Sequence, residues 1–324
     1  MKQIIISAVV ISILIFIAIS LYSFIGKTNH VEINKSDEAL GISTEAETKN
    51  FTNIEDKKDI VPTKERDDIV NIILFGLDRV EPKENSRSDS MIILTVDFKN
   101  KKVKLSSLMR DMYVHIEGYG NTKLGHAYSY GGAALAMKTI NQNFGTNIRD
   151  YVSVDFLGLE KIIDLLGGVN INIKQEEIIE INTASRHDIT ESGKQSLSGS
   201  QAVAYSRIRY AGNGDFDRTE RQRRVLYEIF NKARETQITS ITNLASQILP
   251  LVETSMDRQF ILDMASDYFK SGQLTFDQER FPIDGYYWND MIDGIYYLKF
   301  DTEVTKQQIK DYLYNDVKPT PKRQ

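Results

Sequence analysis

Cysteine is absent from the 324 residues of this chain. Its absence excludes disulfide bonds, thiolate metal sites and cysteine nucleophiles, and it fits a bacterial surface protein. Histidine is scarce, with four residues in the whole chain. A metal centre built from several imidazoles is therefore disfavoured, and His126 is expected to be a structural hydrogen-bonding residue.

An excess of positive charge is also missing, because the formal net charge is −5. No global basic field draws the chain to nucleic acid, so we expect no nucleic-acid partner, and any anion must be bound by local arginines. A Gly-x-Ser-x-Gly elbow, a Walker loop and a dinucleotide fingerprint are absent too. This removes the common serine hydrolases and nucleotide enzymes.

Charged residues are missing from the stretch between Ile4 and Ile25, which is predominantly apolar. As a helix it would be roughly 33 Å long at about 1.5 Å per residue, enough to cross a bilayer. The apolar region of a cleavable signal peptide has about 7–15 residues and a small-residue exit, so a cleaved signal peptide is the weaker alternative. We predict a cytoplasmic N-terminus and an uncleaved transmembrane signal anchor in residues 1–26, with the body outside the cytoplasm.

The composition then divides the rest of the chain. Residues 27–67 are rich in Thr, Asn, Ser, Lys, Glu and Asp, which predicts a flexible stalk. Residues 68–316 are predicted to form the folded domain, and 317–324 a disordered tail.

Within the domain, short β-branched apolar runs alternate with helical patterns. Residues 69–77, 91–98 and 103–108 are typical of buried strands, and 151–173 of a strand, a helix and a second strand. Residues 174–196 are polar and irregular, which predicts a loop. The pattern predicts an α/β fold with a central β-sheet covered by helices on both faces, preceded by one transmembrane helix.

Charged residues cluster where the first three predicted strands begin or end. Asp78, Asp89, Arg110 and Asp111 should meet near one edge of the sheet. Two close carboxylates repel each other unless a cation lies between them, and Mg²⁺ prefers such ligands when it shares its shell with phosphates and water. We therefore predict a Mg²⁺ site, which Mn²⁺ could also occupy, at Asp78 and Asp89. The alternatives are a turn cap for Asp78 and an ion pair with Arg87 for Asp89.

Several arginines lie beside turns or element ends. They are Arg87, Arg110, Arg207, Arg209, Arg218 and Arg221. Arginine stays charged and binds phosphate oxygens in bidentate fashion, so a converging set suits a pyrophosphate. Arg218, Arg221 and Gln222 are spaced by three and four residues, which predicts one shared helix face. The alternative is that these arginines are solvated or paired with acids.

The order of short motifs resembles the LytR-CpsA-Psr family over roughly residues 69–235. The motifs are Gly76-Leu-Asp78, Arg87-Ser-Asp-Ser-Met91, Met109-Arg-Asp-Met-Tyr-Val114, Lys123-Leu-Gly-His-Ala-Tyr128, Gly131-Gly132, Asp164-Leu-Leu-Gly-Gly-Val169, Arg207-Ile-Arg-Tyr210 and Asp215-Phe-Asp-Arg-Thr-Glu-Arg-Gln222. Met109 and Gly125 depart from the family pattern, which usually has proline and asparagine at these positions.

The resemblance implies a membrane-anchored, extracytoplasmic enzyme of a bacterium, with a Gram-positive wall the expected setting. Such an enzyme moves a glycopolymer, for example wall teichoic acid or capsule, from a polyprenyl-pyrophosphate carrier to peptidoglycan. The product is a phosphodiester, and magnesium is required. The resemblance implies metal binding by Asp78 and Asp89, and pyrophosphate contacts from Arg87, Arg110, Lys123, Arg207, Arg209, Arg218 and Gln222. Arg221 belongs to the same expected set through its place on the helix.

The chemistry of such a transfer also calls for a base that deprotonates the incoming hydroxyl. Asp215 is the preferred candidate and Asp111 the second, with Arg110 and Arg218 stabilising the developing charge. A polyprenyl tail needs an apolar slot, for which residues 151–173 and the helices after Gln237 are candidates. Two other functions stay open: a phosphohydrolase acting on the same lipid, and a non-catalytic lipid-binding or regulatory membrane protein.

Overall fold

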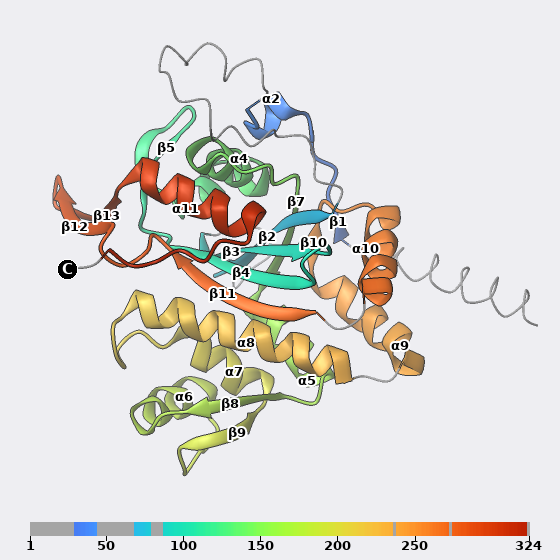
Figure 1. Ribbon diagram of the computed structural model, residues 1–324. Helices are drawn as coiled ribbons and strands as arrows, with labels where there is room; N and C mark the ends of the chain where they lie inside the picture. Colours follow the sequence, from blue (N-terminus) through green and yellow to red (C-terminus); the bar gives the residue numbers. More distant parts are fainter. Residues whose placement is uncertain (1–28, 44–67, 79–86, 236–237, 272–273, 323–324) are drawn as a thin grey trace, which may run out of the picture.

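The computed structural model describes residues 29–43, 68–78, 87–235, 238–271 and 274–322 (Figure 1). The predicted transmembrane segment lies outside these residues. Among the helices that are described, none is both long and apolar enough to cross a bilayer.

A mixed seven-stranded sheet forms the centre of the molecule, and it confirms the predicted central sheet. In spatial order its strands are β1 (Asn29–His30), β10 (Glu253–Thr254), β7 (Asp150–Asp155), β2 (Ile69–Leu77), β3 (Ser88–Asp97), β4 (Lys102–Leu108) and β11 (Thr275–Phe281). The pairs β2–β3 and β3–β4 are antiparallel, whereas β2–β7 and β4–β11 are parallel. The end of β2, the start of β3 and the end of β4 therefore meet at one edge of the sheet.

Helices cover both faces of this sheet, as predicted (Figure 1). They are α2 (Asp37–Leu40), α4 (His126–Phe144), α5 (Phe156–Leu165), α6 (Ile178–Ser185), α7 (Gly199–Arg207), α8 (Asp215–Glu235), α9 (Ile238–Ile248), α10 (Arg258–Ser271) and α11 (Thr302–Asn315), with short 3-10 turns at Gln175–Glu177 and Leu249–Leu251. Three two-stranded sheets complete the fold: β5 (Tyr113–Ile116) with β6 (Gly120–Lys123), β8 (Val169–Ile173) with β9 (Gly193–Leu197), and β12 (Tyr287–Ile292) with β13 (Ile295–Phe300).

The main core lies between the sheet and the pair α4 and α11. Alternate residues of β2, such as Ile73 and Phe75, face apolar side chains of α4, such as Met137 and Ile140. A second core joins β8 and β9 to α6 and α7, with Val225 of α8 at its border. The space between this second core and the sheet is where the apolar cavity described below lies.

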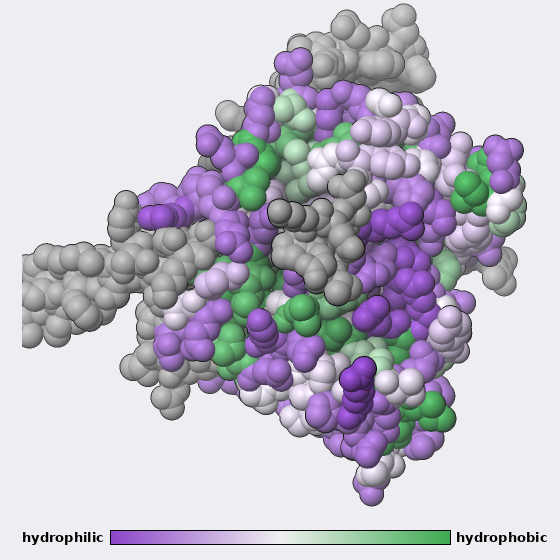
Figure 2. Space-filling view, turned by 180° about the vertical axis from the view of Figure 1, so that it is seen from behind, coloured by the Kyte–Doolittle hydropathy of each residue, from purple (hydrophilic) through white to green (hydrophobic). Residues whose placement is uncertain are grey.

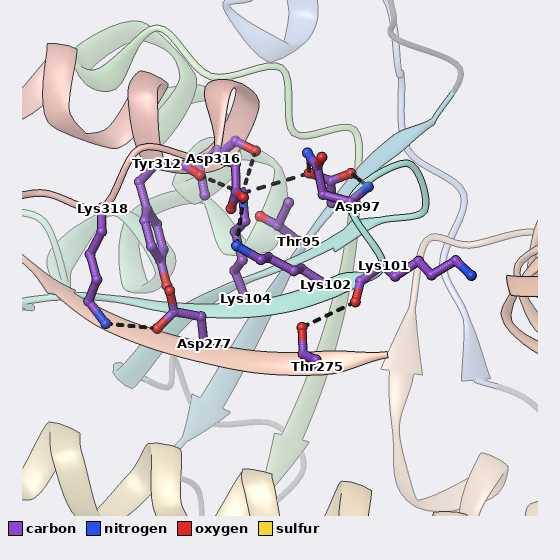
Figure 3. A network of polar contacts seen from close by, with 12 residues as sticks. Thr95, Asp97, Lys101, Lys102, Lys104, Thr275, Asp277, Tyr312, Asp316 and Lys318 are labelled. Carbon is purple, nitrogen blue, oxygen red and sulfur yellow. Dashed lines mark hydrogen bonds and ion pairs between the residues drawn. The ribbon is translucent and has the colours of Figure 1, made fainter. Parts of the chain in front are cut away.

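A buried lysine fixes the end of α11 to the sheet (Figure 3). The Lys104 ammonium on β4 has no exposed surface, and it donates to the carbonyl of Tyr312 at 2.7 Å. It also forms ion pairs with Asp316 at 3.1 Å and with Asp97 at 3.8 Å. Cations are favourable at helix C-termini because the last carbonyls there have no partner within the helix.

Three sequence-based predictions are wrong in part. The stalk was expected to reach residue 67, yet 29–43 fold onto the body: β1 pairs with β10, and Leu40 and Ile42 are buried in the main core. The prediction was wrong here because the average composition of this segment is polar, although these two apolar residues are buried. The remainder of the stalk, 44–67, lies outside the described residues.

The other two corrections concern residues 174–196 and the tail. The expected loop contains α6 and β9, because Ile178 and Ile181 give it a buried side. Residues 317–322 run along the body instead of forming a disordered tail. Lys318 pairs with Asp277 at 3.0 Å, and the Lys322 amide donates to the Asp284 carbonyl at 3.1 Å.

Candidate functional site

A β-bulge between β2 and β3 redirects Asp89 out of the regular sheet. Gly76 pairs with Ser90, but Leu77 pairs with Ser88, so Asp89 is an extra residue between the two pairs. A side chain at Gly76 would come within 2.9 Å of the Ser90 Cβ, which explains the glycine. Bulges commonly re-aim a side chain beside a functional site.

Asp89 enters a group of ion pairs that we call the charged cluster, made of Asp89, Arg110, Asp111, Lys123, Arg209, Asp215 and Arg218. Arg110 follows β4 and reaches Asp89 at 2.5 Å, while Arg209 reaches the other oxygen of Asp89 at 3.4 Å. At the start of α8, Arg218 pairs with Asp215 at 2.7 Å. Segments more than a hundred residues apart therefore meet at one place.

Arg110 connects this group to a second acid. Its Nη2 lies 3.5 Å from Asp215, and its Nε lies 3.7 Å from Asp111. Asp111 in turn accepts from Lys123 at 2.7 Å. In the cluster four cationic side chains face three carboxylates, an excess of positive charge that favours an anionic ligand.

Burial and charge shift the pKa values of the two central arginines in opposite directions. Arg218 is 2% exposed, and burial lowers its pKa to about 10. Burial also acts to lower the pKa of Arg110, but the carboxylates of Asp215, Asp89 and Asp111 outweigh it and raise that pKa. A buried guanidinium with a lowered pKa is stabilised by any anion that comes to lie beside it.

Three buried polar atoms of the cluster have no hydrogen-bond partner among the described residues. They are Nε of Arg110, Nε of Arg218 and Oδ2 of Asp215. Buried groups of this kind are rarely left unpaired, because desolvation costs about 1–3 kcal/mol for each. The cluster has the chemistry to bind an anion with several acceptor oxygens.

An apolar cavity of about 390 Å³ begins at this cluster. Asp89, Ser206 and Gln222 line its polar end. Its walls are apolar side chains of β2, β3, β7, α5, α8, α9 and α10, including Leu74, Ile92, Val152, Val154, Leu159, Ile229, Ile248 and Ile261. Figure 2 shows apolar side chains gathered on this side of the molecule, next to a strongly hydrophilic group. The predicted candidates for an apolar slot, 151–173 and the helices after Gln237, both contribute to the walls.

Comparison with known proteins tests the family resemblance that the sequence motifs indicate. Residues 38–313 match the model of the LytR_cpsA_psr family. The chain therefore belongs to the LytR-CpsA-Psr family. It is 35% identical over 254 residues to the polyisoprenyl-teichoic acid–peptidoglycan teichoic acid transferase TagU of Enterococcus faecalis, an alignment that covers 75% of this chain and 79% of TagU.

Two further proteins are similar over most of the chain. The regulatory protein MsrR of Staphylococcus aureus is 32% identical over 252 residues, covering 76% of this chain and 75% of MsrR. Among solved structures, TagT bound to LIIa-WTA matches with a TM-score of 0.64 at 25% identity, covering 85% of this chain and 98% of TagT. The family resemblance drawn from the sequence motifs is confirmed.

Two residues that the family resemblance implies lie beside the charged cluster. Asp78 and Arg207 line a separate cavity of about 280 Å³, and the Arg207 guanidinium lies 4.3 Å from the centre of the Phe156 ring. Phe156 also lines the apolar cavity, so its ring lies between the two spaces. Arg87 is exposed, and its carbonyl accepts from the Asp78 amide at 3.4 Å.

The structure places Arg221 away from the cluster, contrary to the predicted pyrophosphate contact. Its side chain is buried, and Nε donates to Glu177 at 2.7 Å while Nη2 donates to the carbonyl of Ala211 at 2.7 Å. Residues three apart on a helix differ by about 60° around its axis, so Arg221 reaches Glu177 in the 3-10 turn before α6 while Arg218 reaches Asp89 of β3. Arg221 is bonded to the loop that carries Arg209, which makes it a positioning residue.

The sequence alone did not identify Tyr296 and Phe156 as residues of the site. The Lys123 ammonium lies 5.5 Å from the centre of the Tyr296 ring, and burial and the charges of Asp111 and Asp215 raise the pKa of Tyr296. No motif marks either aromatic residue.

His126 was expected to be a structural hydrogen-bonding residue, and it does form a hydrogen bond with Thr122 Oγ1 at 3.0 Å. Burial and, to a smaller extent, the positive charges of Arg87 and Lys123 lower the pKa of His126.

A metal ion at Asp78 and Asp89 would need further ligands from substrate or water to complete its coordination shell. Within the described residues, no three acidic, histidine or cysteine side chains are grouped so as to hold an ion by themselves. The oxygens of Asp89 already accept from Arg110 and Arg209. This donor set fits a hard ion such as Mg²⁺ that takes most of its ligands from phosphate and water.

Proposed function

We propose that this protein transfers a glycopolymer from a polyprenyl-pyrophosphate carrier to peptidoglycan and forms a phosphodiester bond. The observation that carries the proposal is the position of the charged cluster at the polar end of the apolar cavity. A polyprenyl pyrophosphate has the same two parts, a dianionic head and a long apolar tail. The similarity to TagU, a polyisoprenyl-teichoic acid–peptidoglycan teichoic acid transferase, and to the complex of TagT with LIIa-WTA supports the same substrate class.

In this proposal the apolar cavity holds the beginning of the lipid tail, and Arg110, Arg209 and Arg218 bind the pyrophosphate. Lys123 and Arg87 contribute charge from the rim, Gln222 and Ser206 lie where tail and head join, and Arg207 flanks the site. The Nε groups of Arg110 and Arg218, which make no hydrogen bond within the described residues, supply donors for phosphate oxygens. Arginines placed in this way stabilise the charge that develops on the phosphoryl oxygens during transfer.

The bond changes follow from the chemistry of the substrates. A hydroxyl oxygen of the acceptor attacks the phosphorus that carries the glycopolymer, and the bond from that phosphorus to the bridging oxygen breaks. Polyprenyl phosphate leaves with the electron pair. Asp215 receives the hydroxyl proton on Oδ2, because this oxygen is free of hydrogen bonds from the described residues while Oδ1 is held by Arg218.

Asp78 and Asp89 are the residues proposed to hold Mg²⁺ or Mn²⁺. Bound there, the ion would neutralise part of the pyrophosphate charge.

We also propose that the chain is anchored in the cell membrane by residues 1–26, with the domain on the extracytoplasmic side. A lipid-linked donor and a wall acceptor are both found there.

The test uses the full chain in detergent micelles with a lipid-pyrophosphate oligosaccharide, Mg²⁺ and peptidoglycan fragments. A peptidoglycan product that carries the sugar through a phosphodiester supports the proposal. Release of phosphate without sugar transfer would instead identify a phosphohydrolase. Donor binding without any turnover would identify a lipid-binding or regulatory protein, the class suggested by the name of MsrR.

A further inference from the structure

Two tyrosine rings stack on each other at the surface beside the charged cluster. Tyr119 lies in the turn between β5 and β6, and Tyr130 lies in the first turns of α4. Their ring centres are 4.3 Å apart and their planes differ by 15°. The two residues are 54% and 42% exposed, so the rings pack on each other while much of their surface stays in water.

A hydrogen bond joins the two tyrosines, and there is open space beside the backbone of Tyr119. Gly118 and Gly120 flank Tyr119 with φ values of +80° and +74°, and a side chain at either glycine would meet no atom within 4 Å. The Tyr119 hydroxyl donates to the carbonyl of Tyr130 at 3.4 Å. Exposed aromatic side chains held in one orientation are typical of a binding surface, because little entropy is lost when a ligand stacks on them.

A short series of contacts connects this pair to the charged cluster. The ring of Tyr130 lies 5.8 Å from the ring of His126, and His126 is hydrogen-bonded to Thr122. The next residue, Lys123, forms the ion pair with Asp111. The tyrosine pair is therefore a neighbour of the Lys123 and Asp111 side of the cluster.

The two sides of the cluster have different surroundings. Asp89 borders the apolar cavity, whereas Asp111 and Lys123 are not among its lining residues. Lys123 instead lies against Tyr296 and Tyr297 of β13. In phosphoryl transfer the attacking and leaving oxygens are roughly in line with phosphorus. With the leaving lipid phosphate on the cavity side, the acceptor hydroxyl must arrive from the Lys123 side.

We propose that Tyr119 and Tyr130 form a stacking platform for the pyranose rings of the acceptor glycan. The proposal rests on the proposed transferase function and deepens it. The apolar C–H faces of a pyranose pack well on an aromatic face, and the polar edge of the sugar stays in water. A glycan chain bound there would reach the phosphorus from the side opposite the lipid.

The first test measures acceptor and donor kinetics separately with the full chain in detergent micelles. Tyr119→Ala and Tyr130→Ala should each raise the KM for peptidoglycan glycan strands about threefold to tenfold, as expected for the loss of one stacked ring. The KM for the lipid-linked donor should stay unchanged. Tyr130→Phe keeps the ring and should behave like the wild type, whereas Tyr119→Phe also loses the hydrogen bond to the Tyr130 carbonyl and should raise the KM for glycan strands less than Tyr119→Ala does. Ile179→Ala removes an apolar side chain on α6 that is more exposed than either tyrosine, and it serves as the distant control.

The second test needs no turnover, so it separates failure of the platform from failure of the proposed function. A β-1,4-linked N-acetylglucosamine tetramer is titrated into the full chain by calorimetry. Wild type should bind it, and the Tyr119→Ala/Tyr130→Ala double variant should bind at least tenfold more weakly with an unchanged melting temperature. Equal binding by both proteins would overturn the platform. A rise in donor KM that equals the rise in acceptor KM would also overturn it, because the rings would then support the whole site.

Discussion

At the scale of single residues, the two oxygens of Asp215 have different environments. Arg218 holds Oδ1, while Oδ2 is buried without a hydrogen bond from the described part of the chain. We expect Asp215→Asn to slow glycopolymer transfer about 10²- to 10⁴-fold, the usual contribution of a general base. Donor binding should change little, because the arginines remain. Single-turnover transfer and donor binding by filter retention measure the two effects separately.

Asp217 provides the matched control for this prediction. It lies in the same helical turn, but its Oδ2 accepts from the backbone amide of Asn213 at 2.9 Å. Asp217→Asn should leave the transfer rate within a few-fold of wild type. If Asp111→Asn abolishes transfer and Asp215→Asn does not, the base is Asp111.

Arg221 illustrates an arginine whose role is structural. It forms a buried ion pair with Glu177, and both side chains have almost no exposed surface. Arg221→Leu should lower the free energy of unfolding by about 3–5 kcal/mol, because an unpaired carboxylate is left in the interior. Unfolding in urea, followed by circular dichroism, measures this change.

The double variant Arg221→Leu/Glu177→Leu separates this role from substrate binding. Since both charges are removed together, most of the stability should return. Donor affinity should fall only as far as Arg209 is displaced when its loop loses the hydrogen bonds from Arg221 to the carbonyls of Ile208 and Ala211. An equal loss of donor affinity in the single and double variants, with full stability in both, would mean that Arg221 contacts the substrate.

At the scale of secondary-structure elements, the strand ends were predictable because their signals are local. Residues 69–77 form β2 as predicted, and the residues that follow place Asp78 at its end. The start of β3 was predicted three residues late, at residue 91, since Ser88, Asp89 and Ser90 are polar and the bulge hides their place in the strand. Contacts between distant segments were harder to predict. Arg221 and Glu177 are 44 residues apart in the chain, and Glu177 lay in a segment that was predicted to be a loop.

The cavity could be assigned only to broad segments for a related reason. Apolar residues that line a cavity follow the same periodicity as those that fill a core. On β7, Val152 and Val154 face the cavity, while Tyr151, the residue before Val152, packs in the main core. The sequence shows that these residues are buried, but it does not show that the space beside them is empty.

The strand β7 therefore offers a direct test of the cavity. Val152→Phe adds volume inside it and should weaken binding of a long polyprenyl pyrophosphate about tenfold or more, because the tail loses room. A pyrophosphate with a single short prenyl unit should bind as well as before. Val317→Phe is the matched control, since Val317 is exposed at the surface. Equal weakening for long and short donors would show that the cavity does not hold the tail.

At the scale of the whole molecule, the charged cluster with its excess of cations adjoins the apolar cavity. Burial lowers the pKa of Arg218 to about 10, so its charge carries a desolvation cost at neutral pH that the ion pair with Asp215 offsets only in part. A ligand that binds only the folded state raises stability by RT ln(1 + [L]/Kd), about 2.7 kcal/mol at a hundredfold excess over Kd. A polyprenyl pyrophosphate should therefore raise the melting temperature by several degrees.

Mg²⁺ should act differently when it is added alone. Within the described residues no side-chain group can hold an ion without help, so Mg²⁺ without donor should leave the melting temperature unchanged. Mg²⁺ and donor together should raise it by more than the donor with EDTA, because phosphate oxygens complete the shell. Asp78→Asn should remove this extra shift and keep the shift caused by donor alone. A clear stabilisation by Mg²⁺ in the absence of donor would contradict a shared site and point to a preformed one.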